Sequence, residues 1–153
     1  MAVIFKSAIL SVSADEAWAV VERFMRGEIR VFSFVEDIRL EGDVRVVVSD
    51  VLEQPEQNIT VDSDLRYASY TLLTSPYWQE GYHHGSMRVF DTEGDGRCRF
   101  EWMTDFAPDA LAALFPAEFI EVLWSELVHS LETGEDASPV SSVDVPLPQT
   151  AAQ

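Results

Sequence analysis

The stretch that decides the fold runs from Tyr82 to Phe106 and reads YHHGSMRVFDTEGDGRCRFEWMTDF. Two alternating runs flank the turn-forming residues Glu93-Gly-Asp-Gly96, so the stretch predicts a β-hairpin with a four-residue loop. This loop sets Thr92 opposite Arg97 and thereby fixes the pairing of every residue farther along the two strands.

The predicted register gives the hairpin one polar face and one apolar face. The polar face pairs Phe90 with Arg99, Arg88 with Glu101, Ser86 with Met103, and His84 with Asp105. The apolar face pairs Val89 with Phe100, Met87 with Trp102, Gly85 with Thr104, and His83 with Phe106. We expect the apolar face to be concave and to pack against a helix. Gly85 opposite Thr104 predicts a gap in this wall, in which a ligand would lie.

Alternation and capping signals extend this pattern to the rest of the chain. A strand is expected from Val3 to Val12, followed by a helix that begins with the capping box Ser13-Ala-Asp-Glu16 and ends near Gly27. The short aromatic run Val31 to Val35 is either a helical turn or a connection facing a cavity. Six short strands are expected over residues 36–40, 44–49, 57–62, 65–74, 82–90 and 97–106.

A long apolar-faced helix is expected from Pro108 to Leu131, and Pro116 should kink it or divide it in two. Its acidic residues are expected on a solvated face; they are Glu118, Glu121, Glu126 and Glu132. The element order predicts an α+β domain, in which a curved antiparallel sheet of six to seven strands wraps around this helix.

The chain has 153 residues, enough for one domain with a sizeable core. We expect this domain to span residues 1–133. Residues 134–153 are rich in Ser, Pro, Thr, Ala and Gln without periodicity, which predicts a disordered tail.

The charge of the chain disfavours two classes of partner. Ten Lys and Arg residues against 27 Asp and Glu residues give a net charge of −17, which repels nucleic acid and anionic membranes. The single cysteine, Cys98, cannot form an intramolecular disulfide, and the sequence shows no secretory leader or membrane span. We therefore expect a soluble, cytoplasmic protein without stable membrane association. No pattern in the sequence fixes an oligomeric state.

Particular residues along this element order resemble a known superfamily. The segments that carry the resemblance are Asp15-Glu-Ala-Trp18, Glu56 to Asp62, Tyr67-Ala-Ser-Tyr70, Gly81 to Phe90, Arg99-Phe-Glu-Trp102 and Thr104-Asp-Phe106. From about residue 3 to 132 the chain resembles the START-related polyketide cyclase and lipid-transport superfamily (START/Bet v 1-like, or SRPBCC). Its helix-grip fold is shared with the major birch-pollen allergen. The resemblance implies a deep pocket for sterols, lipids, plant hormones or polyketides undergoing ring closure and dehydration, and it implies no fixed catalytic residues.

Three polar side chains on the predicted concave face are candidate catalytic groups. His83 is either a buried structural histidine or a neutral imidazole suited to proton transfer near pH 7. Tyr70 and Thr104 are candidates to donate hydrogen bonds to a developing enolate oxygen. The candidate ligand-binding residues are Phe34, Leu72, Gly85, Met87, Phe100, Trp102, Phe106, Phe119 and Leu123.

A metal site is not expected. His83 and His84 are adjacent on a strand, so they point to opposite faces and cannot chelate one ion. His84 is expected at the surface beside Asp105. The sequence also contains no glycine-rich phosphate loop, so no nucleotide cofactor is expected.

The function favoured by the sequence is binding of a hydrophobic, oxygenated small molecule in an internal cavity, with cyclisation or dehydration of a polyketide-like substrate as the associated chemistry. Two alternatives belong to other classes. One is a carrier or sensor of a lipid or sterol-like ligand without catalysis. The other is a protein-interaction module that presents its acidic C-terminal surface to a basic partner.

Overall fold

The computed structural model describes residues 2–50, 53–74 and 81–137. The strands and helices follow one another as β1 (Ala2–Leu10), α1 (Ala14–Met25), β2 (Asp37–Glu41), β3 (Val44–Val48), β4 (Glu53–Asp62), β5 (Tyr67–Leu72), β6 (Tyr82–Gly94), β7 (Arg97–Ala107), the 3-10 helix η1 (Asp109–Leu114) and α2 (Ala117–Thr133).

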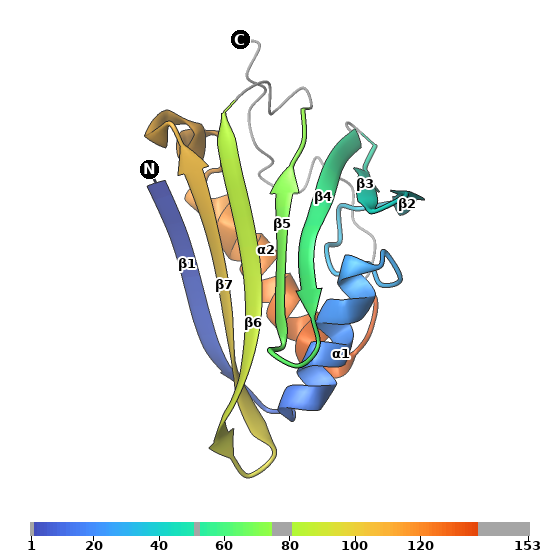
Figure 1. Cartoon of the computed structure of the whole chain (residues 1–153), viewed down its shortest axis with the longest axis vertical. Helices are drawn as coiled ribbons and strands as arrows, with labels where there is room; N and C mark the ends of the chain where they lie inside the picture. The colour runs from blue at the N-terminus through green and yellow to red at the C-terminus, as the bar shows by residue number, and fades with distance from the viewer. Residues whose placement is uncertain (1, 51–52, 75–80, 138–153) are drawn as a thin grey trace.

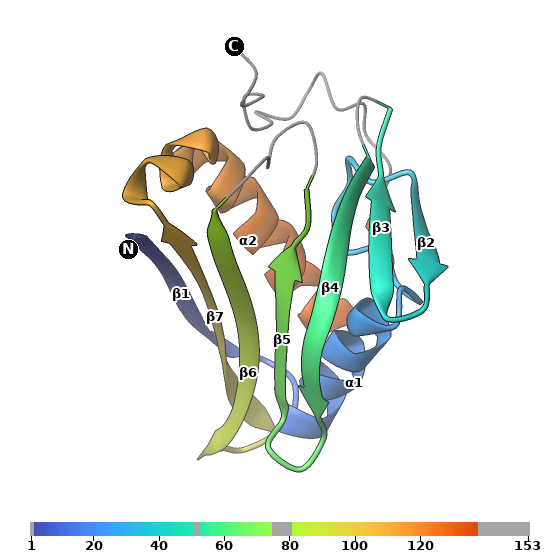
Figure 2. The same cartoon turned by 45° about the horizontal axis from the view of Figure 1, so that its top comes forward.

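The seven strands form one antiparallel sheet in the order β1-β7-β6-β5-β4-β3-β2. The sheet is curved, and both α-helices lie on the same side of it, with α2 crossing behind the central strands (Figures 1 and 2). This arrangement confirms the predicted α+β helix-grip architecture. It places the concave face of the sheet against α2.

The β6–β7 hairpin has the predicted register over its long central part. All eight predicted pairs occur, from Phe90 with Arg99 to His83 with Phe106. The turn itself was predicted wrongly, because Gly94 pairs with Arg97 and the loop contains only Asp95 and Gly96. Asp95 and Gly96 both have positive φ, as a two-residue hairpin turn requires. An irregularity between Phe90 and Gly94 then returns the strands to the expected pairing.

Pro116 divides the C-terminal helical region, as predicted: η1 precedes it and α2 begins directly after it. Carboxylates of α2 then tie the helix to neighbouring elements. Glu121 accepts a hydrogen bond from Lys6 of β1, and Glu132 accepts one from the Ser11 amide at 2.9 Å. Three of the four acidic residues predicted to face solvent therefore hold α2 in place; they are Glu121, Glu126 and Glu132.

Glu126 has a particular role, because it holds the connection between α1 and β2 against α2. Its carboxylate accepts hydrogen bonds from the amide of Ser33 at 2.5 Å and from the Ser33 hydroxyl at 2.6 Å. Ser33 lies between Phe32 and Phe34, so these bonds set the positions of both aromatic side chains relative to the helix.

The chain remains packed for four residues beyond the predicted domain boundary at residue 133. The amide of Arg30 donates to Asp136 Oδ1 at 2.7 Å, and the amide of Ala137 donates to the Arg30 carbonyl at the same distance. Arg23 Nη1 also donates to the Gly134 carbonyl at 3.2 Å. Residues 134–137 therefore belong with the domain, whereas residues 138–153, the rest of the predicted tail, lie outside the described residues.

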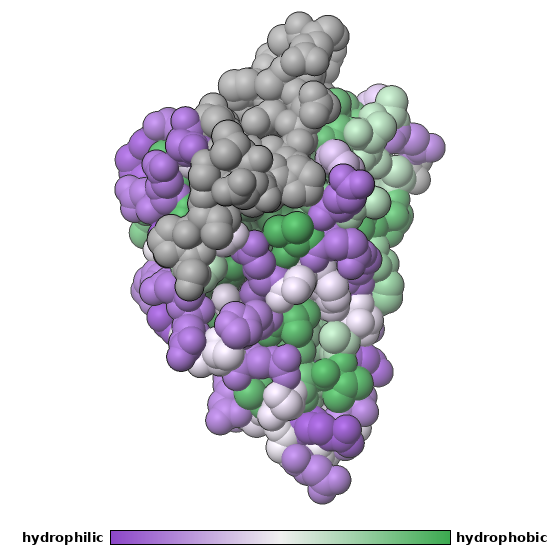
Figure 3. Space-filling view, turned by 180° about the vertical axis from the view of Figure 1, so that it is seen from behind, coloured by the Kyte–Doolittle hydropathy of each residue, from purple (hydrophilic) through white to green (hydrophobic). Residues whose placement is uncertain are grey.

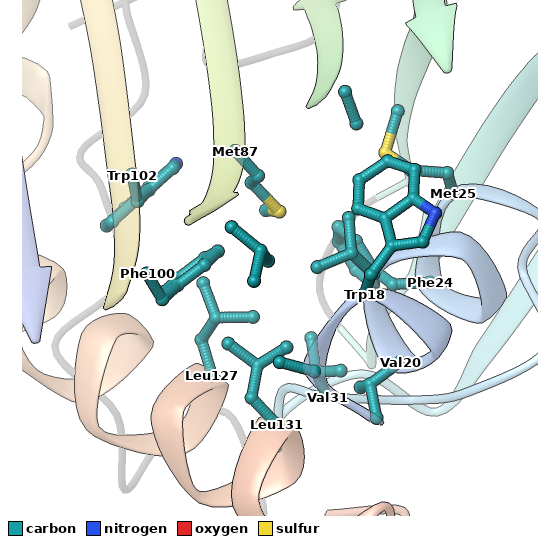
Figure 4. Close-up of a cluster of buried hydrophobic side chains, with 14 of the residues drawn as sticks. Trp18, Val20, Phe24, Met25, Val31, Met87, Phe100, Trp102, Leu127 and Leu131 are labelled. Carbon is teal, nitrogen blue, oxygen red and sulfur yellow. The ribbon is translucent and has the colours of Figure 1, made fainter. Parts of the chain in front are cut away.

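One end of the space between the sheet and the helices is filled by a hydrophobic core, which we call the packed half. Figure 4 shows its side chains converging from the strands and both helices. Its principal members are Trp18, Val21, Met87, Phe100, Leu127 and Leu131, all 6% exposed or less. Seen from the helix side, hydrophilic residues cover much of the outer surface, with hydrophobic ones between them (Figure 3).

Two kinds of feature are absent from the described residues. None of the helices there is long and apolar enough to cross a membrane. In the same part of the chain, no three or more His, Cys, Asp or Glu residues are grouped so that they could hold a metal ion.

Candidate functional site

The other end of this space, which we call the cavity half, contains a pocket between the sheet and the first turns of α2. It provides about 120 Å³ for the centres of water-sized molecules, which is room for several waters or a small organic ring. Its lining residues come from α1, the α1–β2 connection, β3 and the residue after it, β4 to β7, the η1–α2 junction and α2. They are Phe24, Phe32, Phe34, Val47, Ser49, Gln54, Glu56, Tyr70, Leu72, His83, Trp102, Thr104, Phe106, Phe115, Phe119, Ile120 and Leu123.

The strand register places several of the sheet residues in and next to this pocket in two rows that cross neighbouring strands. The first row contains Arg45, Glu56, Leu72, His83 and Phe106, one from each of β3 to β7, and a hydrogen bond from the Leu72 amide to the His83 ring links its β5 and β6 members. The second contains Asn58, Tyr70, Gly85 and Thr104, one from each of β4 to β7. Residues in one row share a face, since paired residues of adjacent strands point the same way.

His83 is buried in the first row, and hydrogen bonds fix both of its ring nitrogens. Nδ1 accepts a hydrogen bond from the Leu72 amide at 3.1 Å, which assigns the ring proton to Nε2. Nε2 then donates to the Thr104 hydroxyl oxygen at 2.7 Å. Burial, with a smaller contribution from neighbouring His84, lowers the pKa of His83 to about 4. The imidazole is therefore neutral at pH 7.

These bonds argue against the predicted role of His83 in moving a proton. A base needs an available lone pair, and the Leu72 amide occupies the one on Nδ1. His83 instead orients Thr104, whose oxygen accepts the Nε2 proton. The Thr104 hydroxyl has no other hydrogen bond among residues 2–50, 53–74 and 81–137, and it lines the pocket. Its own proton is thus available to an occupant of the pocket.

Tyr70 fills the gap predicted at Gly85. A Cβ placed on Gly85 would lie 2.4 Å from Cζ of Tyr70, so the aromatic ring rests directly on the glycine backbone. The phenol oxygen accepts a hydrogen bond from Trp102 Nε1 at 3.1 Å. Burial, and secondarily the charge of Glu56, raise the pKa of the Tyr70 phenol, which keeps it protonated and able to donate.

An ion pair at the β3–β4 side of the pocket was not predicted. Arg45 is completely buried, and its Nη2 lies 3.1 Å from Oε2 of Glu56, its cross-strand partner. Arg45 Nε donates to Asn58 Oδ1 at 2.9 Å, and its guanidinium carbon lies 4.7 Å from the centre of the Phe24 ring. Burial raises the pKa of the Glu56 carboxyl, and Arg45 opposes this rise.

A series of phenylalanine rings starts at Phe106 in the first row and continues across the pocket to the helices. They follow one another from β7 through the η1–α2 junction, α2 and the α1–β2 connection to α1, with successive ring centres 5.0 to 6.5 Å apart. We call this set the phenylalanine arc; its members are Phe106, Phe115, Phe119, Phe34, Phe32 and Phe24. The pocket therefore has one aromatic side and one side with polar groups.

The structure brings most of the predicted site residues together. The predicted residues that line the pocket are Phe34, Tyr70, Leu72, His83, Trp102, Thr104, Phe106, Phe119 and Leu123. Gly85, Met87 and Phe100 do not. Met87 and Phe100 point into the packed half (Figure 4), where Phe100 stacks on Trp124 with ring centres 5.7 Å apart. The lining residues that the sequence did not predict are Phe24, Phe32, Val47, Ser49, Gln54, Glu56, Phe115 and Ile120.

No family model and no curated protein matches the chain. Solved structures do. XoxI from Bacillus cereus matches with a TM-score of 0.70 and 15% identity over 88% of this chain and 95% of its own. The Zhui aromatase/cyclase from Streptomyces sp. R1128 matches with a TM-score of 0.67 and 18% identity, over 86% of this chain and 93% of its own.

A third similar structure is norcoclaurine synthase from Thalictrum flavum, with a TM-score of 0.63, 18% identity and 84% of each chain covered. Each of these matches covers at least 84% of this chain. Together with the seven-stranded antiparallel sheet and the helix it encloses, they show that the chain has the Bet v 1-like helix-grip fold.

Proposed function

We propose that the protein encloses one hydrophobic, oxygen-containing small molecule in the pocket between the sheet and α2. The observation that carries this proposal is the two-sided lining. The phenylalanine arc offers an apolar surface for a flat or unsaturated skeleton, while Tyr70, Thr104 and Glu56 offer a few polar groups on the facing strands. Such a combination is typical of small-molecule sites.

The solved structures with the same fold support this choice of ligand class. Norcoclaurine synthase has been solved in complex with dopamine and hydroxybenzaldehyde, which are small oxygenated aromatic molecules. Another of these structures is an aromatase/cyclase.

Ring closure or dehydration of a carbonyl-rich substrate is the chemistry that the pocket favours. A flexible chain folded between the phenylalanine arc and the sheet would lose conformational freedom before the reaction, which lowers the entropic barrier to ring closure. Tyr70 and Thr104 would donate hydrogen bonds to an oxygen that gains negative charge. His83 would keep the Thr104 hydroxyl in place.

Calorimetric titration with naphthalene and 1-naphthol tests the binding proposal. Both probes should bind the native protein, and Leu123→Trp should abolish binding because the indole fills the pocket beside α2. Ser125→Trp is the matched control, since Ser125 is exposed on the same helix and should leave binding unchanged. Equal affinities in the native protein and in Leu123→Trp would show that the probes bind elsewhere.

The role of Thr104 is tested by the preference for 1-naphthol over naphthalene. One neutral hydrogen bond contributes about 1 kcal/mol, so Thr104→Val should reduce this preference about fivefold.

Mass spectrometry of molecules extracted from the purified protein distinguishes a carrier from an enzyme. A bound lipid that is returned unchanged would indicate a carrier, and a cyclised aromatic product would indicate the enzyme.

A further inference from the structure

We propose that Glu56 is the catalytic base of this pocket and that it removes a proton from a carbon atom of the bound molecule. This inference rests on the proposed function, because it requires a small molecule in the pocket. Ring closure of a carbonyl compound needs a proton acceptor. His83 does not provide one, because both nitrogens of its imidazole already take part in hydrogen bonds.

Glu56 is the one carboxylate among the described residues that line the pocket. Its Oε2 faces Arg45 Nη2 at 3.1 Å. Within the described part of the chain, no hydrogen bond engages Oε1. This oxygen therefore has lone pairs available at the wall of an otherwise mostly apolar cavity, where a carboxylate is a stronger base than in water because it lacks a full hydration shell.

Arg45 acts as a positioning residue for this carboxylate. It is held by a hydrogen bond to Asn58, and the Asn58 side chain in turn donates to the Met25 carbonyl at 2.7 Å at the end of α1. A buried cation fixed in this way holds Glu56 in one orientation and favours its ionised form against the cost of burial.

The groups that face Glu56 across the pocket are consistent with this role. Arg45 on β3 supplies the positive charge, and Tyr70 on β5 and His83 on β6 are the other titratable side chains in the lining. The lining residues of α2 are apolar: Phe119, Ile120 and Leu123. Tyr70 remains protonated and His83 remains neutral, so Glu56 is the acidic lining group that can serve as a proton acceptor in its ionised form, which the neighbouring Arg45 favours.

The proposed step balances without any further reactant. The carboxylate takes a proton from the carbon next to a carbonyl group, and the electrons of that C–H bond form a C=C bond as the carbonyl π electrons move to oxygen. The enolate oxygen accepts hydrogen bonds from Tyr70 and Thr104. After the new ring bond forms, the proton on Glu56 returns to the alkoxide that the attacked carbonyl has become.

The test uses 5-nitrobenzisoxazole, a flat apolar probe whose decomposition starts with removal of a proton from carbon. The base takes the C3 proton, the C–H electrons form the nitrile, and the N–O bond breaks to give the coloured 2-cyano-4-nitrophenolate. We expect the native protein to accelerate this reaction and Glu56→Gln to lose at least about a hundredfold of the acceleration. Glu118→Gln, on the exposed side of α2, is the matched control and should retain it.

The pH profile distinguishes a base from a structural residue. The rate should rise with pH as the Glu56 carboxyl ionises and then reach a plateau. Arg45→Met should shift the midpoint of this rise to higher pH, because the carboxylate loses its positive partner, and Arg45→Lys should move it back. Glu56→Asp, which keeps a carboxylate, should retain the pH-dependent rise at a lower rate, even if Glu56→Gln fails to fold.

Binding is measured before rate so that the two proposals can fail separately. If neither naphthalene nor 1-naphthol binds the native protein, the proposed function is wrong. If it binds in a manner blocked by Leu123→Trp and the native protein shows no acceleration, or Glu56→Gln shows the same acceleration as the native protein, the assignment of the base is overturned and the binding proposal stands.

Discussion

The two halves of the space between the sheet and α2 are built from the same strands, yet one is filled and the other is open. In the packed half, Met87 and Phe100 of the sheet belong to one buried hydrophobic cluster with Leu127 and Leu131 of α2. In the cavity half, the side chains of the next positions along the strands face the phenylalanine arc across a pocket. The alternation of a strand thus decides which side chains face the helix, whereas side-chain packing decides whether space remains between them.

The largest expected difference between the halves concerns two leucines one turn apart on α2. Leu127 is 1% exposed in the packed half, so Leu127→Ala should lower the free energy of unfolding by about 3 to 5 kcal/mol. Leu123 borders a pocket that already exists, so Leu123→Ala should cost less than about 2 kcal/mol. Urea denaturation measures both values, and equal losses would contradict the distinction between the two halves.

The next effect concerns the border between the halves, where Tyr70 covers Gly85. Gly85→Leu should destabilise the protein by about 3 kcal/mol, because its side chain would occupy the place of the Tyr70 ring. Combining it with Tyr70→Ala should cost less than the sum of the two single changes, since the ring has been removed. Thermal and urea unfolding of the three variants give the coupling. Strict additivity would mean that the two residues do not compete for this space.

A pH-dependent effect is expected in the cavity half. The pKa of His83 is about 4 in the folded protein and about 6.5 in an unfolded chain, so the unfolded state binds the proton first as the pH falls. Native stability attributable to His83 is therefore intact above pH 6.5 and decreases between pH 6.5 and 4, at about 1.4 kcal/mol per pH unit.

The variant His83→Gln should lack this decrease. Compared with the native protein, its loss of stability between pH 7 and pH 5 should be smaller by about 2 kcal/mol. The measurement is the free energy of unfolding at both pH values, with His84→Gln as the control. The same pH dependence in His83→Gln and in the native protein would show that His83 is protonated within the fold.

Sequence reasoning was most successful where charge and periodicity constrained the same segment. Complementary pairs such as Arg88 with Glu101 fixed the β6–β7 register, and this register assigned His83 and Thr104 correctly to the concave face. The prediction of the turn was wrong, because Asp95-Gly96 alone forms a complete hairpin turn and the predicted four-residue loop is not needed.

The candidate site was less accessible from sequence, because its composition depends on contacts between distant segments. A gap was expected at Gly85, but the Tyr70 ring of the neighbouring strand fills it, and the sequence does not show where that ring lies. Arg45 and Glu56 are cross-strand partners, but no glycine between them marks the turn that would have set their register. One feature of the sequence could have indicated this ion pair. Arg45 is a charged residue within the apolar run Val44-Arg-Val-Val-Val48, and the next strand carries the acidic residue Glu56.

The smallest effect is expected on the opposite, convex face of the sheet. His84 lies directly across from Asp105, and within the described residues no ion pair or hydrogen bond joins the two side chains. His84→Ala should therefore change the free energy of unfolding by no more than about 0.5 kcal/mol, which is the usual range for a surface position. It should leave the affinity for 1-naphthol unchanged, because the His84 side chain points away from the pocket. Urea denaturation and calorimetric titration test these two expectations separately. A loss of affinity at constant stability would mean that the two faces are coupled through the strand, and that His84 helps to set the position of His83 and Thr104.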